Sequence, residues 1–540
     1  MQQKYWGKDS KITFEKQNQI TNQLKESLND IRHKMRTDMV SAAQLADKYE
    51  EEDHERGLDM LFYNAVKKIS LDCSELVSSL GDQIIQESVK LLVEKPPCDF
   101  QAVAIGSLAK GEATPYSDLE YLFIVEEKTK KTTSYFEKLA ITTYFLIGNL
   151  GETKLSYMAI DELQTWFKDT AINGLKIDGL TTSAGNIPTG NGLTKSRNHF
   201  IVTAEELIQH YKDMYNNPTE ESLRGDLTAM LTCTRPFYSK LDKHKDLCEE
   251  FRAQVDALTP NLARSTMNMQ MFEADITKFD FLPTIKVHEG GYNADVKKEL
   301  YRFPSILLLD LCILLRAKMD TSWSTLERLI QENTISTKLG EVLKFSLAAA
   351  VYIRLSAYLF HNSHDDRMSV AASIRLKSAS PARKRMRWFL PNGLYCKMHA
   401  TLIPLRSRLS ARCGNLKPRD LVTSEFSMDS VWSKVITRFF SGRCEETFSA
   451  LKGILGVDFC RDPVAALKKL MPSLTEISVS TLVQIMAETM LMCEEFQSAL
   501  ALYKYAFDKK IAYQGIVWHY ASLIWENMNR LLRQHNKLHH

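Results

Sequence analysis

The sequence predicts an α+β fold, in which a small mixed β-sheet is followed by a mainly helical body. Two short apolar runs, FQAVAIGS at 100–107 and YLFIV at 121–125, have the length and composition of buried strands. Beyond Glu205, apolar residues recur at helical intervals in nearly every segment, and prolines or glycines separate the segments. Strands early in a chain and helices late are typical of a small sheet domain joined to an all-helical one.

The composition indicates a folded globular protein of several domains. A chain of 540 residues exceeds one hydrophobic core, and its 44% hydrophobic and 25% charged residues are ordinary proportions. The net charge of +3 excludes a protein-wide field that would recruit nucleic acid, so a nucleic-acid partner stays open and would need a local site. The 10 cysteines form no CxxC pair. Because neither a secretory h-region nor a membrane-length apolar run is evident, we expect a cytoplasmic protein without a membrane partner.

Four regions are expected along the chain. Residues 1–58 form a helical extension, and 59–210 hold the sheet. Residues 211–420 form a second, helical domain, and 421–540 a C-terminal helical region. Helical periodicity covers most of the first 93 residues and stops at a Pro-Pro pair, which cannot continue a helix.

Weaker local signals add further elements to the sheet domain. KLSYMAI at 154–160 alternates like a strand, and GLKIDGL at 174–180 is a weaker candidate. A glycine-rich loop follows the second of these. Thr203, with Glu206 three positions on, is expected to cap the next helix.

Between the two main strands the chain carries a pair of carboxylates, Asp118 and Glu120. Side chains alternate faces along a strand, so these two point the same way and repel one another unless a cation joins them. Mg²⁺ (or Mn²⁺), which prefers oxygen ligands, satisfies both at once. Upstream, Gly106 lets a ligand approach the backbone, and Ser107 opens a turn whose free N–H groups suit a phosphate. Lys110, about one turn later, places a cation near the same phosphate.

Each half of this stretch alone has an ordinary structural explanation. A Gly-Ser turn is common, and an Asp and a Glu two apart usually mark a solvated face. The order and the spacing together favour a site for a nucleoside triphosphate, with an anion cradle and a metal clamp. An ion pair from the helical body to these carboxylates would argue against catalysis.

The stretch GSLAKGEATPYSDLEYLFIV, residues 106–125, resembles the signature of the DNA polymerase β-type nucleotidyltransferase superfamily. In that signature a Gly-Ser turn precedes an Asp-x-Asp or Asp-x-Glu pair. The form found here is most similar to the N-terminal domain of PII-protein uridylyltransferases and of related animal proteins that carry TPR-type repeats. With VKKELYRFPSILLLDLCILL, GNIPTG and FIVTAEEL as looser blocks, the resemblance spans about residues 99–405.

The resemblance implies a role for each matching residue. Gly106 and Ser107 would hold the triphosphate, and Asp118 and Glu120 would ligate the metals. Lys110 stands where arginine is usual, which keeps the charge but loses a bidentate fork. The glutamate, one methylene longer than the usual aspartate, is similar to that of the aminoglycoside nucleotidyltransferases.

The superfamily also has a third acidic residue on a later strand, which ligates the metal or accepts a proton. Asp178 in GLKIDGL is the preferred candidate, because it ends a possible strand and opens the glycine-rich loop. Asp161 is the alternative, although an aspartate there serves equally as a helix N-cap.

Three other segments have competing explanations. ARKRMRW at 382–388 suits a phosphate backbone, or is a solvated basic loop. Lys298 and Arg302 have helical spacing and could face the nucleotide, or simply start a core helix. Near the C-terminus, small and aromatic residues follow TPR-like intervals that would build a protein-binding surface, or form an ordinary helical hairpin; they are Ala499, Tyr503 and Ala506.

The predicted function is metal-dependent transfer of a nucleoside monophosphate from a nucleoside triphosphate, such as ATP, to an acceptor hydroxyl. The acceptor could belong to a protein, a small molecule or RNA, and the helical domain would bind it. One alternative is a catalytically silent scaffold that binds proteins through its C-terminal helices. Another is a synthase of a nucleotide second messenger.

Overall fold

The computed structural model describes residues 14–50, 57–92, 94–152, 174–176, 201–216, 233–241, 246–262, 272–276, 292–370, 392–413, 431–440, 443–474, 477–493 and 495–511. Several predictions fall outside these ranges. They are the strand at 154–160, the acids Asp161 and Asp178, the glycine-rich loop and the basic run at 382–388.

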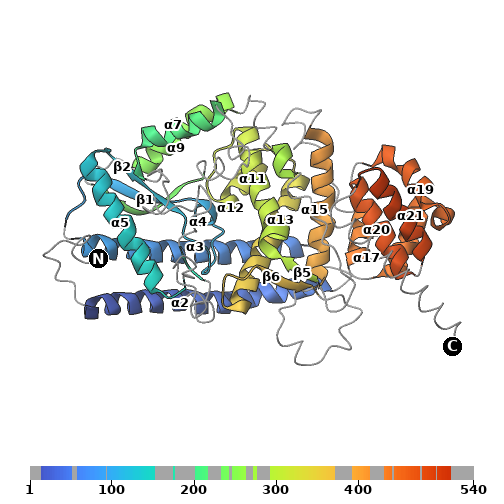
Figure 1. Ribbon diagram of the computed structural model, residues 1–540, viewed down its shortest axis with the longest axis horizontal. Helices are drawn as coiled ribbons and strands as arrows, with labels where there is room; N and C mark the ends of the chain where they lie inside the picture. Colours follow the sequence, from blue (N-terminus) through green and yellow to red (C-terminus); the bar gives the residue numbers. More distant parts are fainter. Residues whose placement is uncertain are drawn as a thin grey trace, which may run out of the picture.

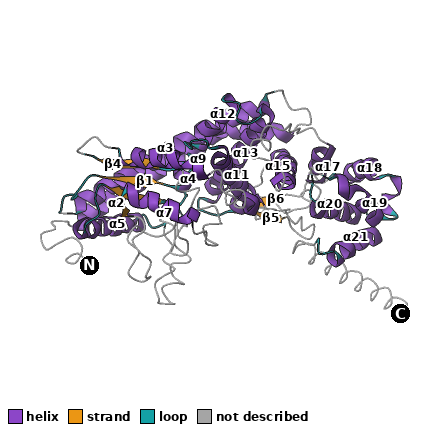
Figure 2. Cartoon of the chain, turned by 90° about the horizontal axis from the view of Figure 1, so that it is seen from above, coloured by secondary structure: helices purple, strands orange, loops and turns teal. Residues whose placement is uncertain are grey.

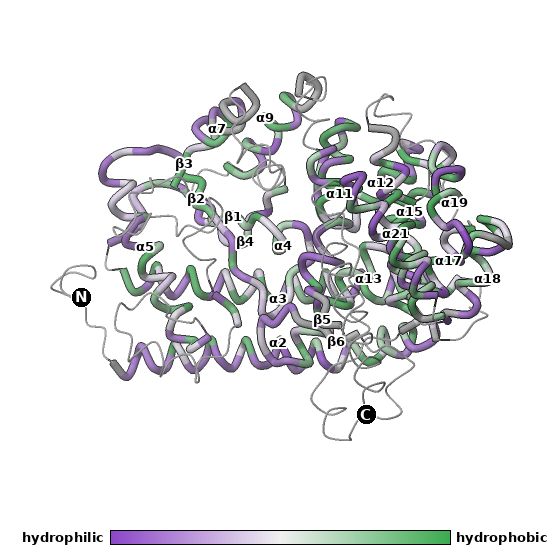
Figure 3. Tube along the Cα trace, turned by 45° about the vertical axis from the view of Figure 1, so that its right-hand side comes forward, coloured by the Kyte–Doolittle hydropathy of each residue, from purple (hydrophilic) through white to green (hydrophobic). Residues whose placement is uncertain are grey.

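Two long helices, α2 (Phe14–Asp47) and α3 (Leu58–Leu91), lie side by side along the molecule (Figure 1). Hydrophobic and hydrophilic residues alternate along both of them, as in amphipathic helices (Figure 3). The buried face of α3 includes Phe62, Val66, Ile69, Cys73, Val77, Leu80 and Ile84. Both helices contribute to the main hydrophobic core, so the predicted N-terminal extension packs as an integral part of the fold.

The elements of the sheet region are β1 (Phe100–Ala104), α4 (Gly106–Ala109), β2 (Tyr121–Val125), α5 (Lys130–Asn149), β3 (Ile201–Val202), α7 (Ala204–Asn216), β4 (Arg235–Lys240) and α9 (Leu247–Leu262). The strands lie in the order β3-β2-β1-β4. β1 is antiparallel to β2 and to β4, whereas β3 is parallel to β2, so the sheet is mixed. The two main predicted strands and the α+β class are confirmed. The fourth strand, β4, begins at Arg235, beyond the predicted domain boundary at residue 210. The sheet therefore continues past that boundary.

Helices cover both faces of the sheet, which explains why the central strands are apolar throughout. On one face, the rings of Phe100 and Phe123 lie 4.8 and 5.5 Å from the ring of Phe136 in α5. On the other face, alternate residues of β1 and β2 pack against α7 and α9; among them are Val103, Leu122 and Ile124. Each central strand is thus buried on both sides.

Helix α7 begins with the predicted capping box. The Thr203 backbone N–H donates to Glu206 Oε2 at 3.2 Å, and the Glu206 N–H donates to Thr203 Oγ1 at 3.2 Å. The two bonds satisfy backbone donors that the first turn of a helix leaves open. This prediction is confirmed.

The helical body consists of β5 (Tyr292–Asp295), the π-helical turn η3 (Val296–Tyr301), α11 (Arg302–Leu315), α12 (Ser322–Gln331), α13 (Thr337–His361), β6 (Arg367–Val370) and α15 (Asn392–Cys413). The strands β5 and β6 pair as a small antiparallel sheet. Figure 2 shows strands confined to the sheet region and this small pair, with helices elsewhere.

Helix α13 contradicts the prediction that no apolar run reaches membrane length. Its length and hydropathy suffice to cross a membrane, yet 89% of its most apolar window is buried inside the protein. Packing against α3, α11, α12 and α15 buries this helix from all sides. The composition that resembles a membrane span is therefore that of the central core helix.

The C-terminal helices pack together at one end of the molecule and join the helical body where the first of them contacts α15 (Figure 1). They are α17 (Val431–Phe440), α18 (Cys444–Leu455), α19 (Pro463–Leu470), α20 (Val479–Met492) and α21 (Phe496–Asp508), with short 3₁₀ turns at Val457–Cys460 and Met471–Ser473. The residues at the predicted TPR-like intervals, Ala499, Tyr503 and Ala506, form the buried face of α21. Packing of α21 against α20 explains their burial, and TPR-type similarity stays a prediction.

Candidate functional site

The turn after β1 brings the predicted glycine and one of the predicted carboxylates into contact. Gly106 adopts φ +63°, in the left-handed region that favours glycine. A Cβ atom on Gly106 would lie only 1.7 Å from Glu120 Oε2, so the carboxylate occupies the space beside the Gly106 Cα. The Ile105 N–H also donates to the Glu120 carbonyl at 3.1 Å. Ser107, directly after the glycine, is partly exposed and opens the short helix α4.

The two carboxylates lie just before β2, in a segment that has no regular secondary structure, and not on the strand itself. Leu119 is buried, whereas Asp118 and Glu120 on either side of it are partly exposed, so the expected alternation of faces holds. The Leu119 N–H donates to the carbonyl of Lys176 at 2.7 Å. Pairing on both sides thus holds the segment in place.

Asp118 lies within a positively charged environment. Its Oδ1 is 3.6 Å from His364 Nδ1 of the helical body and 3.9 Å from Lys176 Nζ, distances too long for hydrogen bonds. This oxygen is buried and accepts no hydrogen bond from a described residue. Burial alone would raise the pKa of Asp118, but His364, Lys176 and Lys297 hold it below its ordinary value. The carboxylate therefore stays ionised.

Lys110 does not point into an open phosphate site. Its side chain is buried, its Nζ donates to Ser305 Oγ at 2.5 Å, and Glu112 Oε2 lies 3.5 Å away. Burial would lower the pKa of Lys110, but the charge of Glu112 raises it above its ordinary value. The ammonium of Lys110 therefore belongs to a buried ion pair, whereas the sequence predicted that it would contact the phosphate.

Sequence reasoning missed Glu112, the most completely bonded side chain of the region. Its carboxylate is fully buried and accepts hydrogen bonds from the hydroxyls of Tyr301 (2.5 Å), Ser305 (2.7 Å) and Ser322. Burial opposes its ionisation, but Lys110 and these hydroxyls keep its pKa below the ordinary value. A charged residue inside the Gly-Glu-Ala-Thr loop was the signal that could have revealed it. The carboxylate ties the turn after α4 to the helical body.

The segment that precedes the carboxylates is held from three sides. Arg32 of α2 lies 4.0 Å above the Tyr116 ring and donates to the Pro115 carbonyl at 3.1 Å. The Tyr116 hydroxyl donates to Asn362 at the end of α13, at 2.7 Å. Arg354 of α13 donates from Nη2 to Ser117 Oγ at 3.3 Å. The position of Asp118 is therefore set by helices distant in the sequence.

The third carboxylate stays a prediction. Asp178 and Asp161 lie outside the described residues. Among the described residues, no group of three or more His, Cys, Asp or Glu side chains is arranged to hold a metal ion. The site as described therefore contains two of the predicted acidic residues, Asp118 and Glu120.

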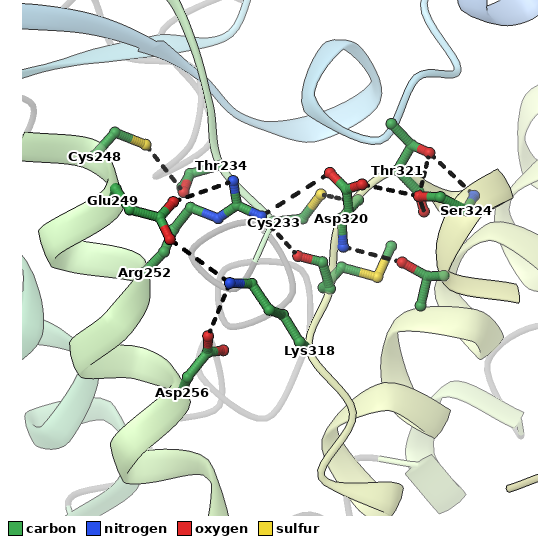
Figure 4. A network of polar contacts seen from close by, with 12 residues as sticks. Cys233, Thr234, Cys248, Glu249, Arg252, Asp256, Lys318, Asp320, Thr321 and Ser324 are labelled. Carbon is green, nitrogen blue, oxygen red and sulfur yellow. Dashed lines mark hydrogen bonds and ion pairs between the residues drawn. The ribbon is translucent and has the colours of Figure 1, made fainter. Parts of the chain in front are cut away.

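A second contact between the sheet region and the helical body is largely exposed (Figure 4). Lys318, between α11 and α12, lies 3.7 Å from Glu249 and 3.4 Å from Asp256 on α9. Arg252 of α9 lies 4.0 Å from Asp320. Exposed pairs of this kind each contribute about 0–1 kcal/mol. The buried Glu112 cluster is therefore the stronger connection.

Residues 63–152 match the family described as "Putative nucleotidyltransferase DUF294". This stretch is therefore similar to nucleotidyltransferases of that family. The match runs from α3 through both central strands and α5, and so includes Gly106, Ser107, Asp118 and Glu120. It supports a nucleotidyltransferase-type activity in general and does not distinguish the uridylyltransferases from other branches. Curated proteins include no significant match to the chain.

Proposed function

We propose that the protein transfers a nucleoside monophosphate from a nucleoside triphosphate to an acceptor hydroxyl, with Mg²⁺ or Mn²⁺ bound at Asp118 and Glu120. The acceptor hydroxyl would lose its proton to solvent, and its oxygen would bond to the α-phosphorus as the bond from that phosphorus to the α–β bridging oxygen breaks, so that pyrophosphate leaves. The observation that carries the proposal is the position of the Glu120 carboxylate against Gly106, which joins the acidic segment to the turn that opens with Ser107.

The residues present suit a hard divalent cation. Asp118, which is ionised, and Glu120 two positions later would provide oxygen ligands, and the buried Asp118 Oδ1 accepts no hydrogen bond from a described residue. When bound, such an ion would polarise phosphate oxygens and neutralise their charge. The protein would contribute the ionised state of Asp118, the fixed segment before β2 and the close backbone approach at Gly106.

A catalytically silent scaffold is the second candidate, because one observation favours it. His364, from the helical body, lies with its Nδ1 3.6 Å from Asp118 Oδ1, the oxygen that would bind a metal. In that case the C-terminal helices would supply the function by binding a partner protein. A cytoplasmic location is proposed for either candidate.

Replacing Asp118 with asparagine is expected to abolish the metal-dependent effect of nucleotides. The change keeps the shape of the side chain but removes the charge that binds a cation. We expect each effective nucleoside triphosphate, given with Mg²⁺ or Mn²⁺, to raise the melting temperature of the wild type but not of Asp118→Asn. Transfer of label from an α-³²P nucleotide, tested with ATP, UTP, GTP and CTP, would identify the base.

Asp256→Asn is the matched control, because that carboxylate lies on the surface of α9 and pairs only with Lys318 among the described residues. It should retain the full shift. If the wild type and Asp118→Asn shift equally, the enzyme proposal is wrong and the scaffold is favoured.

A further inference from the structure

The π-helical turn η3 carries a lysine that acts electrostatically on the candidate site. This turn joins β5 to α11, and π-helical turns are rare and frequent at functional sites. Asp295 caps it by accepting from the Lys298 N–H at 2.8 Å, and the Val296 N–H donates to the Asp366 carbonyl at 2.7 Å. Fixed in this way, the turn leaves Lys298 exposed and Lys297 partly buried, within electrostatic range of Asp118.

Lys297 lies among both basic and acidic side chains. Arg354 and Arg302 act on it electrostatically, as do Asp118 and Asp366. One of these, Asp366, already accepts a hydrogen bond from the Tyr358 hydroxyl. Lys297 itself forms no ion pair with a described residue. Burial and Arg354 lower the pKa of Lys297, although Asp118 and Asp366 oppose that shift.

Arg354 provides an independent observation that points to an anion site. Its side chain is only 3% exposed and lies between the rings of Tyr301 and Tyr358, 4.3 and 5.4 Å away. Nε donates to the Tyr358 hydroxyl and Nη2 to Ser117, both at 3.3 Å. The buried Nη1 finds no acceptor among the described residues. An incompletely bonded buried guanidinium costs free energy, which an anion at the cluster would offset.

We propose that Lys297, with Arg354 behind it, forms an anion subsite that binds the terminal phosphates of a nucleoside triphosphate from the helical-body side. Lys297 contacts the phosphate directly. Arg354 is a positioning residue, since it holds Ser117 next to Asp118 and adds a fixed positive charge. This inference rests on the proposed function. It gives the recognition of a polyphosphate to Lys297 and Arg354, because Lys110 is held in the buried pair with Glu112.

Titration calorimetry with inorganic tripolyphosphate, in the absence of metal, tests the subsite. The wild type should bind this probe, and Lys297→Gln should bind it about tenfold more weakly, as expected for one charged contact. Lys298→Gln is the matched control, because that neighbouring side chain is 65% exposed and pairs with Asp295. It should bind within about twofold of the wild type, whereas Lys297→Arg should restore most of the affinity.

Thermal melting of the same variants separates recognition from structure. Since the folded protein disfavours the charged form of Lys297, Lys297→Gln should melt at a higher temperature than the wild type while it binds the probe more weakly. A residue with only a structural role would lose stability instead. If Lys297→Gln melts lower, or binds tripolyphosphate as the wild type does, the subsite is wrong.

Two further measurements distinguish this inference from the proposed function. Asp118→Asn should keep metal-free tripolyphosphate binding while it loses the metal-dependent nucleotide shift. If the wild type shows the metal-dependent nucleotide shift and Lys297→Gln shows the same shift, the subsite is wrong but the proposed enzyme function stands. Orthophosphate should bind more weakly than tripolyphosphate, and tighter binding of orthophosphate would overturn the assignment to terminal phosphates.

Discussion

Gly106→Ala is expected to lower kcat/KM for nucleotide transfer by at least about 100-fold. A methyl group at this position would lie 1.7 Å from Glu120 Oε2, so the carboxylate must move. Displacement of a catalytic group by about 1 Å costs on the order of 100-fold in rate. The φ of +63° adds about 1–2 kcal/mol of strain for an alanine. Steady-state kinetics and the metal-dependent nucleotide melting shift measure the effect.

Gly148→Ala provides the control for this substitution. Gly148 lies in the last turn of α5, where a Cβ would meet no atom within 4 Å. Alanine there should leave activity unchanged and stabilise the helix by about 0.5–1 kcal/mol. If Gly106→Ala keeps wild-type kinetics, contact between the glycine turn and Glu120 is not needed for the reaction.

Glu112→Ala is expected to destabilise the protein by about 3–5 kcal/mol, the typical cost of removing one partner of a buried ion pair. Three hydroxyls and the Lys110 ammonium would lose their common acceptor in a site without solvent. Urea unfolding followed by near-ultraviolet circular dichroism measures the change. Glu112→Gln combined with Lys110→Met, which leaves no unpaired charge, should recover part of the loss.

Acid unfolding tests the same cluster by another route. The pKa of Glu112 is lower in the folded protein than its ordinary value of 4.5, so the unfolded chain binds more protons in acid. Its contribution to stability is complete above pH 4.5 and is lost as the pH falls through the folded pKa. Glu112→Gln should therefore show a weaker pH dependence below pH 4.5. An unchanged dependence would mean that Glu112 contributes little ionic stabilisation.

The local elements could be predicted because their signals are short-range. The runs that became β1 and β2 are apolar throughout, and the Thr203–Glu206 box satisfies its own backbone donors. The alternation around Leu119 also follows from extended backbone geometry alone. Such patterns depend on a few neighbouring residues and therefore survive without knowledge of the fold.

The partners of the site residues could not be predicted in the same way. Lys110 was assigned to a phosphate because its spacing from Ser107 allowed it, but Ser305 and Glu112 bind it. Lys298 was a candidate because its spacing from Arg302 is helical, yet in the π-helical turn η3 Lys298 is exposed and Lys297 is partly buried. In both cases the competing partner comes from a distant helix or from an uncommon backbone geometry.

By itself the sequence determined the fold class, the two central strands and the pairing of a glycine turn with two carboxylates, because periodicity and spacing are local properties of the chain. Only the tertiary structure decided which charges meet. It placed His364 against Asp118 and buried Glu112 beneath three hydroxyls of the helical body. Electrostatic energy depends on distance in space and on burial, and neither is encoded in the separation of two residues along the chain.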